Sequence, residues 1–243
     1  MRWSGCTCAS GRRRRSGDGA RFAGWRRVVN RLLVLPPEAP PRALYVLAHG
    51  AGAGMRHPFL EHIARALAER GIGTFRYEFL YMEKKSGRPD PPAVAAARVR
   101  EAVAEAAREA PGIPLIAGGK SFGGRMTSTA QAEEPLPGVR GLVFLGFPLH
   151  PPGKPGTARA EHLTEVRIPL LFLQGTRDEF AGLDLLRPVV DALGPRATLT
   201  PIEGGDHSFK VPKILGRTPA DVLAQLADTI VTWVESPTSG IRG

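Results

Sequence analysis

Residues 118–124 read GGKSFGG, and this stretch admits two interpretations. The triplet at 119–121 is how a phosphate-binding P-loop ends, whereas residues 119–123 also match G-x-S-x-G, the turn that presents a nucleophilic serine. A P-loop needs a further glycine five positions before the triplet, and Pro114 stands there. Residues 113–119 also have the apolar character of a buried strand, so the pattern excludes a P-loop and favours the serine turn.

The composition is that of one globular domain with a basic tail. The chain has 243 residues, 42% of them hydrophobic, and a formal net charge of +10. Residues 1–27 contain eight arginines and one aspartate, so they carry +7 of this charge. The remainder is only mildly basic, and a nucleic-acid partner is therefore not indicated beyond the tail. We expect a disordered tail at 1–27, one domain at 28–236 and a short C-terminal tail at 237–243.

The basic tail at 1–27 could instead be a phosphate-binding arm. It is not a signal peptide. The apolar run VVNRLLVL at 28–35 is short, is interrupted by Asn30 and Arg31, and leads to no small-residue cleavage site. Cys6 and Cys8 are the only cysteines, which excludes a disulfide framework. With no apolar run long enough for a membrane span, these features predict a cytoplasmic protein that is not bound to membranes.

From residue 28 onward, apolar runs of strand length alternate with amphipathic helical patterns. Such alternation predicts a mostly parallel sheet with helices on both faces, and ligands then bind beyond the carboxyl ends of the strands. The expected strands are 28–35, 43–49, 72–79, 113–119, 141–147, 168–175 and 197–204, and the expected helices are 58–71, 91–110, 183–194 and 219–236.

Three of these strand ends carry the side chains that nucleophilic catalysis needs. A serine hydroxyl attacks well only when a base removes its proton, and a histidine oriented by a carboxylate is the usual base. Ser121 follows strand 113–119, Asp178 follows strand 168–175, and His207 follows the last strand. This chain order of serine, carboxylate and histidine predicts a catalytic triad.

Each assignment has an alternative. His207 is the only one of the six histidines after the last strand, but it could be an ordinary surface histidine. Asp178 could be a helix cap, with Glu179 or Asp184 supplying the carboxylate. Asp206 adjoins the histidine and is too constrained by the chain to reach around it.

A glycine-rich loop, HGAGAG at 49–54, directly follows strand 43–49. Backbone N–H groups in such a loop stabilise the oxyanion of a tetrahedral intermediate. We expect one donor to be the N–H of Phe122, just after the nucleophile, and the second to be the N–H of Ala51. The glycine spacing does not match the G-x-G-x-x-G of a dinucleotide site, and no metal or cofactor is implied.

Together with these motifs, the phrases GGKSFGGRM, GFPLHPPGKP and LFLQGTRDEF resemble the α/β-hydrolase superfamily, and more narrowly its small dienelactone-hydrolase-like branch. That branch includes testis-expressed hydrolase-like proteins and a scaffold subunit of a histone acetyltransferase complex. The resemblance covers residues 28–236. It implies an α/β-hydrolase fold and either a serine hydrolase acting on a small acyl substrate or a non-catalytic binding or scaffold protein.

Two departures qualify the resemblance. Dienelactone hydrolases proper are similar but use a cysteine nucleophile, where this chain has Ser121. Lys120 beside the serine is not typical of many esterases, so it either favours an anionic substrate or faces solvent. Residues 146–166, where many relatives insert a lid, are too few for several helices, which predicts an open or shallow site without a lid domain. Oligomeric state is left open.

Overall fold

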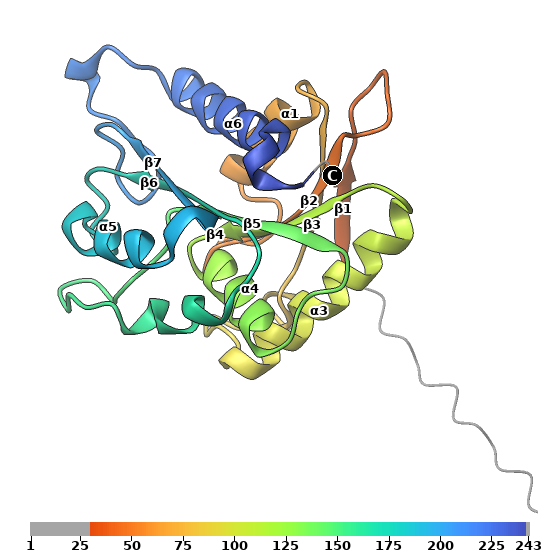
Figure 1. The fold of residues 1–243 in the computed structure, drawn as a ribbon, viewed down its shortest axis with the longest axis horizontal. Helices are drawn as coiled ribbons and strands as arrows, with labels where there is room; N and C mark the ends of the chain where they lie inside the picture. The colour runs from red at the N-terminus through yellow and green to blue at the C-terminus, as the bar shows by residue number, and fades with distance from the viewer. Residues whose placement is uncertain (1–29, 242–243) are drawn as a thin grey trace, which may run out of the picture.

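A single sheet of seven strands organises residues 30–241, the part of the chain that the computed structural model describes (Figure 1). The expected tail at 1–27 lies outside the described residues. The strands are β1 (Arg31–Val34), β2 (Ala43–Ala48), β3 (Ile72–Tyr77), β4 (Leu115–Lys120), β5 (Val139–Leu145), β6 (Leu170–Gly175) and β7 (Ala197–Ile202).

The strand order is β1-β3-β2-β4-β5-β6-β7. Every neighbouring pair is parallel except β1 and β3, which run antiparallel. All six residues of β2 are buried, as expected of a central parallel strand that is covered on both faces. The prediction of a mostly parallel sheet is therefore confirmed.

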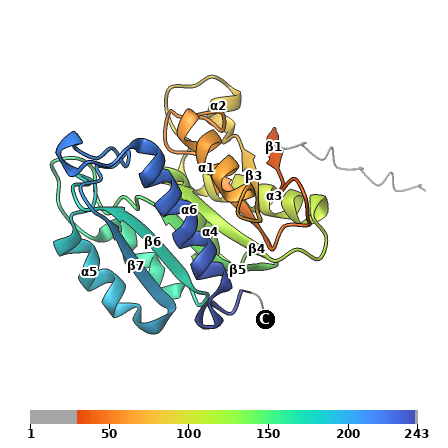
Figure 2. The same cartoon turned by 90° about the horizontal axis from the view of Figure 1, so that it is seen from above.

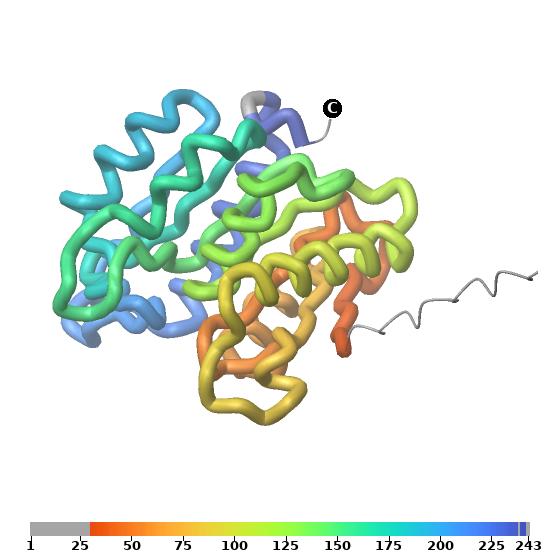
Figure 3. Tube along the Cα trace, turned by 90° about the horizontal axis from the view of Figure 1, so that it is seen from below, coloured from red at the N-terminus to blue at the C-terminus, as the bar shows by residue number. Residues whose placement is uncertain are grey.

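Helices cover the sheet in two layers. They are α1 (Pro58–Ala68), α2 (Leu80–Glu83), α3 (Pro92–Glu109), α4 (Phe122–Glu133), α5 (Leu183–Ala192) and α6 (Pro219–Glu235). In Figures 1 and 2, α1 and α6 lie on one face of the sheet, and Figure 3 shows α3, α4 and α5 on the other.

The alternation of side chains along the strands divides the core between these layers. Tyr45 and Leu47 of β2 pack in a cluster with α1 and α6, whereas Leu44 and Val46 pack with α3, α4 and α5. Predicted helix boundaries differ from the observed ones by a few residues. For example, α1 ends at Ala68 instead of residue 71.

Within residues 30–241, no lid domain covers the sheet edge. The segment at 146–166 contains one short 3-10 helix, η1 (Ala158–Glu165), which the sequence patterns did not predict. Three further 3-10 turns are η2 (Gly194–Arg196), η3 (Lys213–Leu215) and η4 (Pro237–Ser239). After η4, Ile241 is fully buried against the domain, so the expected C-terminal tail folds back at least that far. Among the described residues, no helix is long and apolar enough to cross a membrane.

Candidate active site

The GGKSFGG stretch forms a sharp turn between β4 and α4. β4 ends at Lys120 and α4 begins at Phe122, so Ser121 alone makes the connection. Its backbone has φ 49° and ψ −115°, a combination that is uncommon for a residue with a side chain and that costs about 1 to 3 kcal/mol. This geometry lifts the Ser121 side chain beyond the carboxyl end of the sheet.

The two outer glycines of G-x-S-x-G are required by space. A Cβ atom on Gly119 would overlap the carbonyl oxygen of Ala48, at the end of β2. A Cβ on Gly123 would overlap the carbonyl oxygen of His49. Both glycines therefore allow the turn to pack directly against the loop that follows β2.

The three residues predicted as a triad lie within hydrogen-bonding distance of one another. His207 Nε2 is 2.8 Å from Ser121 Oγ, and His207 Nδ1 is 2.7 Å from Asp178 Oδ2. Asp178 is 3% exposed. Its carboxylate also accepts bonds from the side-chain amide of Gln174, at 2.7 Å, and the N–H of Phe180, at 2.9 Å. These bonds fix the carboxylate that faces the imidazole.

The loops after β6 and β7 are joined, which brings Asp178 and His207 together. Arg177 N–H donates to the Gly205 carbonyl at 2.9 Å, and Gly204 N–H donates to the Thr176 hydroxyl at 2.8 Å. Phe180 places its ring 4.2 Å from the imidazole centroid. The catalytic histidine candidate is therefore held by backbone bonds on one side and an aromatic ring on another.

The carboxylates kept as alternatives lie elsewhere. Glu179 and Asp184 are exposed. Asp206 accepts the N–H groups of Ser208 and Lys210, at 2.8 and 2.9 Å, so its carboxylate orders the turn after the histidine. Of the four carboxylates that the sequence offered, only Asp178 pairs with the imidazole.

Two unused N–H groups lie beside the serine. Phe122 is the first residue of α4, where backbone N–H groups have no partner within the helix. Among the described residues, neither Phe122 N–H nor Ala51 N–H donates a hydrogen bond. Gly50, next to Ala51, would bring a Cβ within 3.9 Å of Ser121 Cβ. Both predicted donors are thus available near the nucleophile candidate.

The glycine-rich loop is held by two groups that sequence reasoning did not single out. Tyr81 hydroxyl accepts the N–H of Gly52 at 2.9 Å. Glu78 accepts the N–H of Met55 at 3.1 Å, and its other oxygen lies 3.1 Å from His49 Nε2. Glu78 directly follows β3 in the structure, but the expected strand at 72–79 contained it, so the strand-end rule did not select it.

Burial raises the pKa of the Glu78 carboxyl, but the neighbouring His49 imidazole and the hydrogen bond from the Met55 N–H outweigh this effect and lower the pKa overall. The carboxylate therefore stays charged. His49 is fully buried, its Nδ1 lies 2.8 Å from the Gly50 carbonyl, and its Nε2 accepts the N–H of Phe79 at 3.2 Å. This imidazole fixes the start of the loop.

Lys120 turns toward the histidine loop instead of bulk solvent. Its Nζ donates to the His207 carbonyl at 2.5 Å and lies 5.5 Å from the centroid of the Phe209 ring. Burial lowers the pKa of the ammonium to about 8, although the charges of Asp178 and Asp206 oppose the shift. Lys120 thus contacts the loop that carries the base.

A second serine–histidine pair lies outside this constellation. Ser128 of α4 places its Oγ 2.8 Å from His162 Nε2 in η1. The two residues are not at strand ends, and no sequence motif marks them. Among residues 30–241, no group of three or more His, Cys, Asp or Glu side chains is arranged to hold a metal ion.

Comparison with known proteins agrees with this geometry. Residues 41–235 match the family described as alpha/beta hydrolase domain. A lid-less α/β serine hydrolase from Xanthomonas campestris superposes with a TM-score of 0.66 at 22% identity, over 85% of this chain and 89% of that one. A dienelactone hydrolase from Anabaena variabilis gives 0.64 at 21% identity, over 84% and 89%.

An α/β serine hydrolase homologue from Coxiella burnetii also gives a TM-score of 0.64, at 20% identity over 83% of this chain and 89% of that one. At these identities the superpositions speak for the fold alone. They confirm the α/β-hydrolase fold expected from the sequence. With its family match over residues 41–235, the chain belongs to the α/β-hydrolase domain family.

Proposed function

We propose that this protein is a serine hydrolase that cleaves an ester, a thioester or a similar acyl bond through an acyl-enzyme on Ser121. The observation that carries the proposal is the continuous hydrogen-bonded chain from Ser121 Oγ through His207 to Asp178. Such a chain gives a weak nucleophile a base, and gives the base a fixed orientation.

Each member of the chain has one role in the proposed reaction. Ser121 Oγ attacks the carbonyl carbon while His207 Nε2 takes its proton, and His207 then returns the proton to the leaving alcohol or thiol. Water, activated by the same imidazole, next attacks the acyl-enzyme and releases the acid and the serine. Asp178 accepts the Nδ1–H bond throughout and stabilises the imidazolium.

The oxyanion of both tetrahedral intermediates is assigned to the N–H groups of Phe122 and Ala51. Their position beside the serine and their lack of another acceptor among the described residues support this role. Fixed donors of this kind typically contribute about 100- to 1,000-fold in rate each. The loop at 49–54 should therefore matter nearly as much as the triad.

The proposed setting is the cytoplasm, and the proposed partner is a small acyl substrate, with neither nucleic acid nor membrane required. The solved structures named as an α/β serine hydrolase and a dienelactone hydrolase support the reaction class only through their shared fold. The competing proposal is a fold that binds but does not react, as in the scaffold relatives.

The test measures substrate hydrolysis and looks for the covalent acyl-enzyme at the same time. Purified full-length protein is offered a series of p-nitrophenyl esters and matched thioesters of increasing acyl length, and intact mass is recorded during turnover. We expect hydrolysis and an acyl adduct, both absent from Ser121→Ala. Circular dichroism establishes that the variant is folded. A folded wild type that hydrolyses none of these and does not form an adduct would refute the proposal and favour the binding protein.

A further inference from the structure

A groove separate from the triad runs between the length of α1 and the first half of α6. Its third side is the segment at 208–213, which follows His207. The cavity volume is about 830 Å³, within the range of small-molecule sites, and no member of the triad lines it. Phe209 forms the wall on the side of the triad, with Lys120 Nζ 5.5 Å from its ring centroid.

The floor of this groove is apolar. Phe59 of α1 and Phe209 stack with ring centroids 5.8 Å apart and an interplanar angle of 16°. Opposite them, α6 contributes Val222, Leu223 and Leu226 to the same lining. A hydrocarbon chain laid on such a surface is stabilised by every methylene that leaves water.

The rim of the groove is cationic. The lining includes four basic side chains, Arg65, Lys210, Lys213 and Arg217. Among the described residues, none of the four forms an ion pair. The lining contains one acidic side chain, Glu69, so its four cations leave it with a net positive charge. The cations are left to attract an anion from solution.

Exposed apolar side chains extend the groove at one end. In the η3 turn Ile214 is 93% exposed and Leu215 is 45% exposed, directly after Lys213 in the sequence. In Figure 1 the blue segment before α6 stands away from the body of the fold. These two side chains add apolar surface next to Lys213 of the groove lining.

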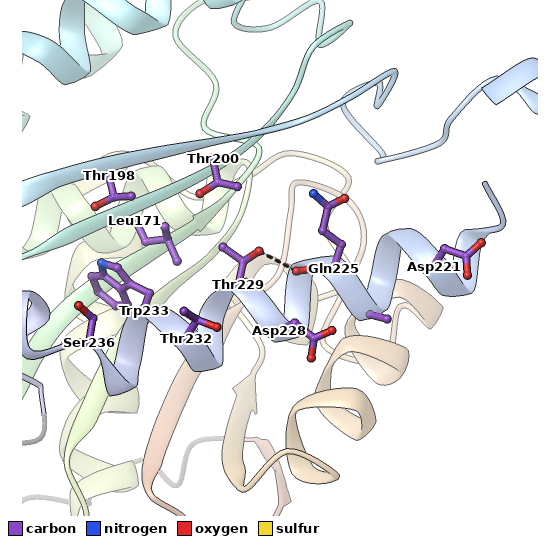
Figure 4. Close-up of a pocket in the computed structure, with 11 residues that line it drawn as sticks. Leu171, Thr198, Thr200, Asp221, Gln225, Asp228, Thr229, Thr232, Trp233 and Ser236 are labelled. Carbon is purple, nitrogen blue, oxygen red and sulfur yellow. Dashed lines mark hydrogen bonds between the residues drawn. The ribbon is translucent and has the colours of Figure 1, made fainter. Parts of the chain in front are cut away.

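A second groove shows that these properties are not general to the surface. It lies between α6 and the strands β6 and β7, with a volume of about 730 Å³ (Figure 4). Its lining holds several threonine hydroxyls and two carboxylates, Asp221 and Asp228, but no lysine or arginine. Asp228 is paired with Arg70 at 2.5 Å, and the lining itself offers an anion no cation, unlike the groove between α1 and α6.

We propose that the groove between α1 and α6 binds a single-chain anionic amphiphile, such as a medium- or long-chain carboxylate. The tail lies along the floor of Phe59, Phe209 and Leu223, and the anionic head reaches the rim cations. The ligand is a monomer taken from water, and a bilayer lipid is the alternative that the test separates. This site is distinct from Ser121 and requires no turnover.

The test uses the full-length Ser121→Ala protein, so that binding is measured without catalysis and independently of the proposed hydrolase function. Decanoate is titrated calorimetrically below its critical micelle concentration, with butyrate and decyltrimethylammonium in parallel. We expect saturable binding of decanoate, with affinity for the other two weaker by about tenfold or more, because one lacks the tail and the other has the wrong charge.

Variants locate the site. Lys213→Glu in the exposed rim should weaken decanoate binding by about tenfold, while Arg187→Glu, an exposed charge reversal on α5, should leave it unchanged. Leu223→Gln should also weaken decanoate binding, because it places a polar amide in the apolar floor. The proposal is overturned if decanoate does not bind, if Lys213→Glu and Leu223→Gln bind it as the parent does, or if binding requires vesicles of anionic phospholipid.

Discussion

Residues 30–241 contain two serine–histidine pairs with the same separation, which differ in their backbone setting, their proton orientation and their electrostatic surroundings. Ser121 Oγ and Ser128 Oγ each lie 2.8 Å from an imidazole Nε2. Ser121 stands alone between a strand and a helix, with φ 49°. Ser128 lies within α4, where its hydroxyl donates to the Arg125 carbonyl at 2.9 Å. That leaves the Nε2–H of His162 to donate to Ser128, the reverse of what a general base does.

The two imidazoles also differ in electrostatic surroundings. His207 faces the Asp178 carboxylate at 2.7 Å, whereas among the described residues no carboxylate forms an ion pair with His162. Burial, and then the charge of Arg125, lower the pKa of His162 to about 4. A base with so low a pKa removes protons poorly at neutral pH. The distance between a serine Oγ and an imidazole Nε2 therefore does not by itself make the serine a nucleophile. The direction of the hydrogen bond between them and the carboxylate at Nδ1 of the imidazole decide it.

The sharpest test of this contrast is to remove each hydroxyl in turn. Ser121→Ala should lower kcat by about a million-fold, as loss of a triad nucleophile does, because no other group is activated. Ser128→Ala should leave kcat within about twofold, since its role is structural. The rates are measured on an activated ester, and the site of fluorophosphonate labelling is read by peptide mass. Labelling at Ser128 would contradict the contrast.

The carboxylate behind His207 should have the second-largest effect. Asp178→Asn keeps the shape but favours the wrong imidazole tautomer, and in triads this costs about 10⁴-fold in kcat. Glu179→Gln is the matched control, because Glu179 is the exposed neighbour that the sequence left as an alternative. The comparison is made by steady-state kinetics. Equal losses in the two variants would show that Asp178 is not the orienting carboxylate.

The Ser121–His207 pair and its carboxylate were predictable from sequence because their members obey local rules. Ser121 is marked by flanking glycines whose small size the structure requires, and Asp178 and His207 each follow an apolar strand. Because parallel strands all end at one edge of the sheet, these three residues are brought together there. The same local reasoning placed the central strands of the sheet, since buried parallel strands are unbroken apolar runs.

The Ser128–His162 pair could not be predicted in this way. Its partners are 34 positions apart, one within a helix and one in a 3-10 turn, and their meeting depends on how η1 packs against α4. Lys120 presents the same difficulty, because its position in the chain does not reveal that its side chain reaches the His207 carbonyl. Contacts made by tertiary packing between irregular segments leave no periodic signal.

The His162 imidazole should make the free energy of unfolding depend on pH in the acid range. The pKa of His162 is about 4 in the folded protein, against 6.5 for an unperturbed histidine. As pH falls through 6.5 the unfolded chain takes up a proton that the folded one does not, so stability falls between pH 6.5 and pH 4.

His162→Gln should remove this slope. Allowing for partial exposure of the side chain, the free energy of unfolding of wild type should fall relative to the variant by on the order of 2 kcal/mol between pH 7 and pH 4. Urea unfolding at several pH values measures the difference. Parallel pH dependences of the two proteins would show that His162 is not held in its neutral form by the fold.

The last difference between the pairs is what surrounds each serine oxygen. Beyond Ser121 lie N–H groups without acceptors, whereas Ser128 sits where helix N–H groups are already bonded. Tyr81 helps to hold the Ala51 donor, because its hydroxyl accepts the N–H of the adjacent Gly52.

Tyr81→Phe should therefore lower kcat by about tenfold with little change in KM, less than the loss of a whole donor, because the loop is loosened but Ala51 N–H remains. Tyr45→Phe is the matched control: Tyr45 hydroxyl donates to the buried Val143 carbonyl at 2.9 Å, away from the oxyanion loop. That variant should lose stability but keep kcat. If both variants lose stability and neither loses kcat, Tyr81 supports the fold alone, and the placement of the oxyanion donor rests on His49 and Glu78.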